Sequence, residues 1–181
     1  MEIIFEGISL RPWQIDDASR LAYIADDKAI SDNLRDVLPF PYSLQDAIWW
    51  LNEILPKNSP PRYFAVLFNM EIVGSIGIEL KSDIYRMNAE IGYFLIRQHW
   101  QKGIMTRAIK AVASYAFSEF DVTRIYAEVF CDNIGSGKAL TKAGFTHEAT
   151  LRRSIIKNSI VKDACIYSLL KEDFKYYVQI G

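Results

Sequence analysis

Residues 91–106 read IGYFLIRQHWQKGIMT, an apolar run followed by a polar turn and a glycine. The apolar run is typical of a buried strand. Beyond Gly103, small and apolar residues recur every three or four positions as far as Ala116, which predicts a long amphipathic helix. The first amides of a helix have no intrahelical acceptors, and its dipole places positive charge there. A glycine at this point lets a ligand approach the backbone, so the junction suits a pyrophosphate, although a plain helix start has the same pattern.

Strands and helices alternate from this junction toward both ends of the chain. On the N-terminal side, the residue pattern predicts strands over 3–11, 63–68, 72–80 and 89–96, and helices over 16–26, 28–34 and 43–54. On the C-terminal side it predicts a strand over 124–130, a helix over 133–143 and a strand pair over 145–156 and 160–170. This order favours an α+β fold (α/β in looser usage) with a mixed, mostly antiparallel sheet flanked by helices. We expect residues 1–181 to form one domain.

Composition excludes several classes of protein. The 181 residues are 50% hydrophobic, which is typical of a packed globule, and 21 Lys+Arg against 22 Asp+Glu give a net charge of −1. That balance argues against a protein that holds nucleic acid mainly through its phosphates. No apolar run approaches the roughly 20 residues that span a bilayer. The N-terminal MEIIFE lacks a basic region followed by an apolar core, so we expect no signal peptide and a cytoplasmic location.

The two cysteines, Cys131 and Cys165, are far apart in the sequence. Neither belongs to a CxxC pattern or has a histidine at ligand spacing, so we expect no zinc or other metal site. We also expect no disulfide, and interpret the pair as two small apolar side chains in a reducing compartment.

A second junction, CDNIGSGKALTKAGF over 131–145, combines polar side chains with glycines at the start of a helix. Asn133 and Ser136 are three residues apart and therefore share one face, where they could hold a ligand amide or deliver a proton. Alternatively, Asn133 only caps the helix. Gly135 and Gly137 are unfavourable inside a purely structural helix, which favours close approach of another group.

Taken in order, several short segments resemble the GCN5-related N-acetyltransferases (GNAT), and most closely the Rim-type acetyltransferases of ribosomal-protein N-termini. The segments are LRPW (10–13), NLRD (33–36) with PFPY (39–42), AEIGY (89–93), WQKGIMT (100–106), Asn133-x-x-Ser136 with Gly144-Phe145, and Asp163 with YSLL (167–170). The resemblance covers almost the whole chain and implies the GNAT acyl-CoA N-acyltransferase fold.

The resemblance implies an enzyme that moves an acetyl group from acetyl-CoA directly to a primary amine. The leading acceptor is a protein or peptide N-terminus, such as that of a ribosomal protein. The alternatives are a small amine (a polyamine or aminoglycoside), for which Asp26, Asp27, Asp32 and Asp36 could supply negative charge, and a catalytically silent acyl-CoA-binding module. We expect a monomer or homodimer without a nucleic-acid or membrane partner.

The resemblance also assigns contacts to acetyl-CoA. The pantetheine arm would pair with the backbone near the end of the strand, and the pyrophosphate with amides of the following turn and helix. Asn133 would bond the pantetheine, and Lys138 would meet a phosphate. The full set is Phe94, Leu95, Ile96, Gln101, Lys102, Gly103, Ile104, Met105, Thr106, Asn133 and Lys138.

Catalytic roles follow from the chemistry of amine acylation. A protonated amine must lose a proton before it attacks, and Glu90 is the first candidate base, directly or through a water, with Glu148 as the alternative. Many relatives use a tyrosine at the position of Leu140 to protonate the leaving thiolate, and the resemblance implies that Ser136 serves here instead. Alternatively, a thiol with a pKa near 8.5 leaves as the thiolate without an acid. Residues Arg35, Asp36 and Trp50 are expected on the acceptor side.

Overall fold

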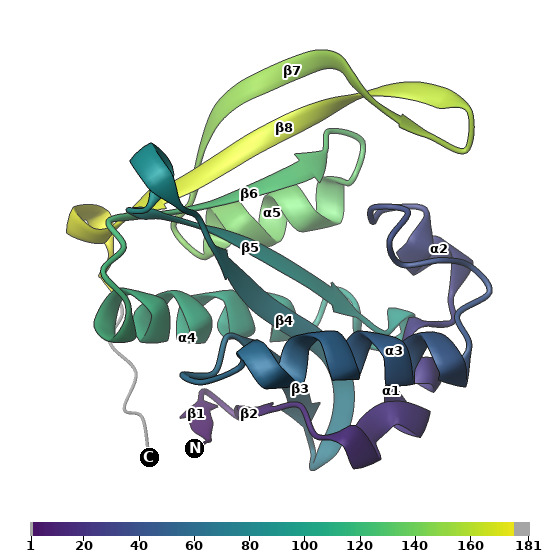
Figure 1. Cartoon of the computed structure of the whole chain (residues 1–181). Helices are drawn as coiled ribbons and strands as arrows, with labels where there is room; N and C mark the ends of the chain where they lie inside the picture. Colours follow the sequence, from purple (N-terminus) through teal and green to yellow (C-terminus); the bar gives the residue numbers. More distant parts are fainter. Residues whose placement is uncertain (1, 176–181) are drawn as a thin grey trace.

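One eight-stranded sheet organises the computed structural model, in which residues 2–175 are described. The strand order is β1-β2-β3-β4-β5-β6-β8-β7 (Figure 1). All neighbouring strands are antiparallel except β5 and β6, so the predicted mixed, mostly antiparallel sheet is confirmed. The strands are β1 (Ile3–Phe5), β2 (Ile8–Pro12), β3 (Tyr63–Phe68), β4 (Glu71–Leu80), β5 (Asn88–Leu95), β6 (Arg124–Phe130), β7 (Thr146–Lys157) and β8 (Ile160–Leu170).

Helices pack on both faces of the sheet, and each face has its own apolar cluster. The larger cluster joins the sheet to α4 (Ile104–Glu119) and α5 (Ile134–Lys142). The smaller cluster joins it to α1 (Ala18–Ala25) and α3 (Leu44–Ile54), while the short α2 (Lys28–Ser31) lies under the tip of the β7–β8 hairpin (Figure 1). Within residues 2–175, no helix has both the length and the apolar character needed to cross a bilayer.

Local sequence explains where α3 begins. Ser43 Oγ accepts a hydrogen bond from the Asp46 amide at 3.2 Å, and the Asp46 carboxylate accepts one from the Ser43 amide at 2.8 Å. This reciprocal capping box satisfies two amides that the first helical turn leaves without intrahelical acceptors. Ser43 is therefore the N-cap of the helix that the sequence predicted over 43–54.

The predicted single strand over 3–11 is wrong in one respect, because the chain forms a tight hairpin there. Glu6 and Gly7 have φ of 45° and 81°, and they reverse the chain between β1 and β2. Gly7 adopts this left-handed backbone without steric penalty. Because apolar residues flank the turn on both sides, the pattern of apolar residues alone does not indicate it.

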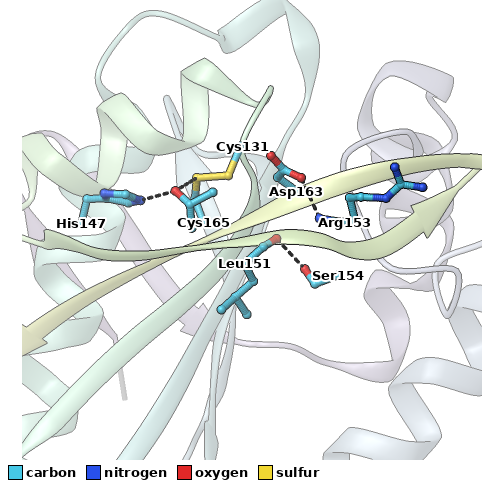
Figure 2. The surroundings of a disulfide bond; sticks show 8 residues. Cys131, His147, Leu151, Arg153, Ser154, Asp163 and Cys165 are labelled. Carbon is cyan, nitrogen blue, oxygen red and sulfur yellow. Dashed lines mark hydrogen bonds between the residues drawn. A yellow bond between two sulfur atoms is a disulfide. The ribbon is translucent and has the colours of Figure 1, made fainter.

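The expectation that the cysteines form no disulfide is also wrong, because Cys131 and Cys165 are joined by one. Cys131 follows the end of β6, Cys165 lies on the neighbouring β8, and the Cys131 amide donates to the Asp163 carbonyl at 3.0 Å. Figure 2 shows the disulfide beside the bend in the β7–β8 hairpin, where the Arg153 amide donates to the Asp163 carboxylate. Sheet pairing brings together residues that are 34 positions apart, a proximity that cysteine spacing alone does not reveal.

Candidate functional site

The central feature of the site is the divergence of β5 from β6. Their parallel pairing extends only from Asn88–Arg124 to Glu90–Tyr126, although β5 continues to Leu95. Beyond Glu90, the edge of β5 that faces β6 therefore has no partner strand within the described sheet. An extended ligand can occupy such an edge through backbone hydrogen bonds.

The backbone groups at the end of β5 are partly used within the chain. The Ile96 amide donates to the Val73 carbonyl on β4 at 2.8 Å, and Trp100 Nε1 donates to the Leu95 carbonyl at 2.7 Å. Because backbone groups alternate in direction along a strand, the Leu95 amide faces the diverging β6, whereas Phe94 faces β4. Of the predicted pantetheine contacts over 94–96, the Leu95 amide is the group best directed toward a ligand.

The turn before α4 is shaped by two residues with left-handed backbone. Gln101 has φ of 62°, and Gly103, the N-cap of α4, has φ of 71° and no side-chain cap. A Cβ added at Gly103 would meet nothing within 4 Å, so this surface is open to a ligand. The side chains of Ile104 and Met105 are buried in the core, so only their backbone amides can contribute.

The remaining polar residues of this turn differ in exposure. Lys102 is exposed and Thr106 is half-buried. Arg107 is directed at carbonyl groups, since its guanidinium donates to the carbonyls of Glu6 at 2.5 Å and Lys102 at 3.3 Å. Lys102 is therefore the cation of this turn that is directed to solvent.

Glu90 on β5 is the centre of an ion-pair network on the face of the sheet opposite α4. Its carboxylate accepts hydrogen bonds from Arg35, from Lys81 Nζ at 2.6 Å and from the Tyr126 hydroxyl at 3.3 Å. Burial by itself raises the pKa of Glu90, but the Lys81 hydrogen bond and the Arg35 charge outweigh it, and the pKa is lowered. Glu90 is therefore a carboxylate at neutral pH and a weak base.

Apart from Arg35, the sequence did not indicate the residues that surround Glu90. In the sheet register Glu79 on β4 lies opposite Glu90, Glu90 opposite Tyr126, and Tyr126 opposite Ser168 on β8. Polar side chains thus form a row across four strands. The alternation of polar residues in β4 and β6 could have indicated this row, but only the sheet register shows that its members lie side by side. Beside this row lies a cavity of about 430 Å³ lined by Lys81, Ser82, Tyr85, Asn88, Arg124 and Tyr126.

Glu148, the alternative base, lies at the far end of this row on β7. Its carboxylate accepts hydrogen bonds from Ser168 and from Arg124 at 2.6 Å. These two contacts lower the pKa of Glu148. Both candidate bases are therefore ionised and paired.

Asn133 and Ser136 lie at the start of α5, across the gap between β5 and β6. Asn133 caps the helix, accepting the Ser136 amide through Oδ1 at 3.1 Å, so its Nδ2 is the group left for a ligand. Ser136 Oγ is 2.7 Å from the Tyr93 hydroxyl on β5. Burial raises the pKa of Tyr93 far above its usual range, so this hydroxyl stays protonated.

Gly137 has a packing role that the sequence did not reveal. A Cβ at this position would lie 2.8 Å from the Tyr167 hydroxyl, so the group that approaches the helix closely is a tyrosine of β8. The exposed Lys138 lies beside it, on the rim of a cavity of about 310 Å³ that Asn133, Gly137, Tyr167 and both disulfide cysteines also line.

The tip of the β7–β8 hairpin is bound to the segment around α2. Lys157, whose side chain is 5% exposed, pairs with Asp36 at 2.7 Å, and Asn158 Nδ2 donates to Asp32 at 2.8 Å. We call these two contacts the hairpin clasp. Asp36, predicted to contact the acceptor, is thus held by the hairpin, while Arg35 beside it reaches Glu90.

The other predicted acceptor-side groups are also engaged within the chain. Trp50 on α3 packs edge-on against Trp13 and Tyr63, each at 6.1 Å between ring centroids, so it belongs to the smaller apolar cluster. Asp26 accepts the Tyr42 amide, and Asp27 pairs with Arg97. Together with the clasp, these contacts give each of the four carboxylates considered for a polyamine a partner within the chain, although the Asp36 side chain stays 84% exposed.

Comparison with known proteins gives a family match. The family model described as "Acetyltransferase (GNAT) domain" matches residues 8–146, which is more than half of the chain.

Individual relatives agree with this match. YoaA of Bacillus subtilis strain 168, named an uncharacterized N-acetyltransferase, is 40% identical over 101 residues, which are 56% of each chain. YdaF of the same strain, named a putative ribosomal N-acetyltransferase, is 29% identical over 94% of each chain. A solved structure of RimL, described as a ribosomal L7/L12 alpha-N-protein acetyltransferase in complex with coenzyme A, shares the fold. Its TM-score is 0.85 at 18% identity, over 94% of this chain and 98% of that chain.

Proposed function

Because the chain belongs to the acetyltransferase (GNAT) family, and is thus an N-acetyltransferase that uses acetyl-CoA, we propose that its acceptor is the α-amine of a protein or peptide. The observation that carries this proposal is the paired state of Glu90. A carboxylate held by Lys81 and Arg35 is a weak base, which suits an amine that loses its proton easily.

The pKa of the acceptor decides between amine classes. An α-amine has a pKa of about 8, so roughly a quarter of it is neutral at pH 7.5, whereas a lysine with a pKa of about 10.4 is neutral in about one molecule per thousand. A weak base can complete the deprotonation of the first but contributes little to that of the second. The names of YdaF and RimL, which refer to ribosomal-protein acceptors, support the same class.

The residues present fit the donor. The open edge of β5 at Leu95 would hold the pantetheine arm, and the amides around Gly103 would hold the pyrophosphate. Asn133 and Lys138 would add side-chain contacts from α5. When bound, acetyl-CoA supplies the acetyl group as a thioester. The chain orients that group and manages the protons.

The proton transfers are assigned to the two candidate side chains. Glu90 accepts the amine proton through a water, because its oxygens already bind Arg35, Lys81 and Tyr126. Ser136 donates its hydroxyl proton to the departing sulfur. The amine nitrogen bonds to the thioester carbon, the carbonyl oxygen takes up negative charge, and the carbon–sulfur bond then breaks. Solvent afterwards restores the protonation states of Glu90 and Ser136. The Leu95 amide is directed toward the same gap and can stabilise the developing oxyanion.

Matched acceptors test the proposal. Thiol release from acetyl-CoA is measured with a peptide that has a free N-terminus and no lysine, and with the same peptide N-terminally blocked and carrying one lysine. Spermidine is the third acceptor. We expect turnover with the free N-terminus to exceed turnover with the other two by at least about 10-fold, as the amine pKa values predict.

Each contrary outcome has its own meaning. Faster turnover of spermidine or of the lysine peptide contradicts the proposed acceptor class. Binding of acetyl-CoA by calorimetry without thiol release from any amine identifies a silent acyl-CoA-binding module instead.

A further inference from the structure

Tyr93 on β5 contacts α5 across the gap between β5 and β6. Its hydroxyl lies 2.7 Å from Ser136 Oγ and 3.5 Å from the Ser136 carbonyl oxygen. The residues are 43 positions apart, and Tyr93 lies beyond Glu90, where the pairing of β5 with β6 ends. The contact is therefore a specific bridge across the edge at which acetyl-CoA is proposed to bind.

The direction of this hydrogen bond matters for the serine. The partner of the Tyr93 hydroxyl is Oγ and not the carbonyl, because 2.7 Å is an optimal separation for two hydroxyl groups while 3.5 Å to the carbonyl is at the limit; at 2.7 Å either hydroxyl can donate. A serine hydroxyl has one hydrogen and two acceptor sites. When Tyr93 fills one acceptor site, the hydrogen of Ser136 stays available for another partner.

The serine is fixed at its backbone as well as at its side chain. The Ser136 amide donates to Asn133 Oδ1 at 3.1 Å, which holds the first turn of α5. With the backbone held by Asn133 and Oγ held by Tyr93, the remaining freedom of the side chain is small. Both partners lie at the gap and not in the acceptor-side network of Glu90.

We infer that Tyr93 is a positioning residue for the transfer: it binds Ser136 Oγ so that the serine hydrogen is directed to the departing sulfur. This inference rests on the proposed function, in which Ser136 donates the proton that the sulfur receives. Tyr93 also stabilises the negative charge that Ser136 gains as it gives up its proton, and it loses no proton overall. No further reactant is required.

The test uses the full chain and three variants at the bridge. Tyr93→Phe removes only the hydroxyl, Ser136→Ala removes the donor, and the double variant removes both. We expect Tyr93→Phe to lower kcat about 10-fold and Ser136→Ala about 100-fold, with KM for acetyl-CoA within about two-fold of the unmodified chain. The double variant should match Ser136→Ala, because Tyr93 acts only through the serine.

Tyr115→Phe is the matched control. Tyr115 is 1% exposed on α4, and its hydroxyl has no hydrogen-bond partner among the described residues. Its removal should leave kcat unchanged. Circular dichroism and thermal unfolding establish that each variant is folded.

Two results would overturn the inference while leaving the proposed function intact. One is a kcat for Tyr93→Phe within two-fold of the unmodified chain. The other is a double variant in which the two losses multiply, since that shows that Tyr93 acts independently of Ser136. An unmodified chain that releases no thiol with any amine overturns the proposed function and the inference with it.

Discussion

At the scale of single residues, Glu90 combines a structural and a proposed chemical role. It neutralises Lys81 and Arg35 on the face of the sheet opposite α4, and it is the carboxylate assigned to the amine proton. The two roles oppose one another, because each cation that stabilises the carboxylate also weakens it as a base. The lowered pKa of Glu90 keeps it ionised over the whole neutral range.

Glu90→Gln should lower kcat about 10- to 100-fold, with the largest loss below the acceptor pKa of about 8. At higher pH the amine is already neutral and needs no base, so the rates of variant and unmodified chain should converge. The pH profile of kcat measures this. Glu79→Gln is the matched control, since Glu79 lies opposite Glu90 and accepts a hydrogen bond from Tyr63. Equal rates across pH would remove Glu90 from the mechanism.

Gly103→Val should weaken acetyl-CoA binding at least about 10-fold, because a β-branched residue strains a left-handed backbone and covers the open surface of the turn. Calorimetry gives the dissociation constant. Because asparagine tolerates a left-handed backbone, Gly103→Asn should weaken acetyl-CoA binding less than Gly103→Val. Unchanged affinity in the valine variant would contradict the pyrophosphate assignment.

At the scale of elements, the sequence predicted nearly every helix and strand because their signals are local. The periodicity of α4 and the apolar runs that became β3 and β4 each depend on a few neighbouring residues. The β1–β2 turn was missed because it lies inside an apolar run. Contacts that depend on the sheet register could not be predicted from local sequence. They are the partners of Glu90, the approach of Tyr167 to Gly137, and the disulfide.

The Cys131–Cys165 disulfide should stabilise the C-terminal elements, because it joins the end of β6 to β8 and closes a loop of 34 residues. Chain-entropy arguments give about 2–4 kcal/mol of unfolding free energy for a loop of this size. Urea unfolding with and without dithiothreitol measures the contribution. The variant with both cysteines changed to serine should be insensitive to the reductant. Equal stability of the oxidised and reduced chains would contradict the expectation.

At the scale of the whole molecule, paired carboxylates join different elements of the fold. Asp17 pairs with Arg11, Glu90 joins β5 to Arg35, and Glu148 joins β7 to Arg124 on β6. The pKa of each carboxylate is lowered in the folded chain. Their stabilisation is thus complete above the unfolded pKa of about 4 and is lost as pH falls through the lower folded values.

The free energy of unfolding should therefore fall on acidification from about pH 5 to pH 3. Urea unfolding over this range measures the slope. Asp17→Asn removes one of the contributing groups and should give a shallower slope. A variant slope identical to that of the unmodified chain would show that the Arg11–Asp17 pair does not contribute.

The short parallel ladder between β5 and β6 also governs how the molecule opens. Within residues 2–175, the sheet segment β1–β5 pairs with the segment β6–β8 through three residue pairs, all between β5 and β6. Amide hydrogens of β6 and β8 should therefore exchange with solvent through a partial opening that leaves β3 and β4 protected. Acetyl-CoA, bound across both segments, should slow that exchange. The unfolding of the protein would then be least cooperative without acetyl-CoA. The bound donor would join the two segments of the sheet where β5 and β6 do not pair.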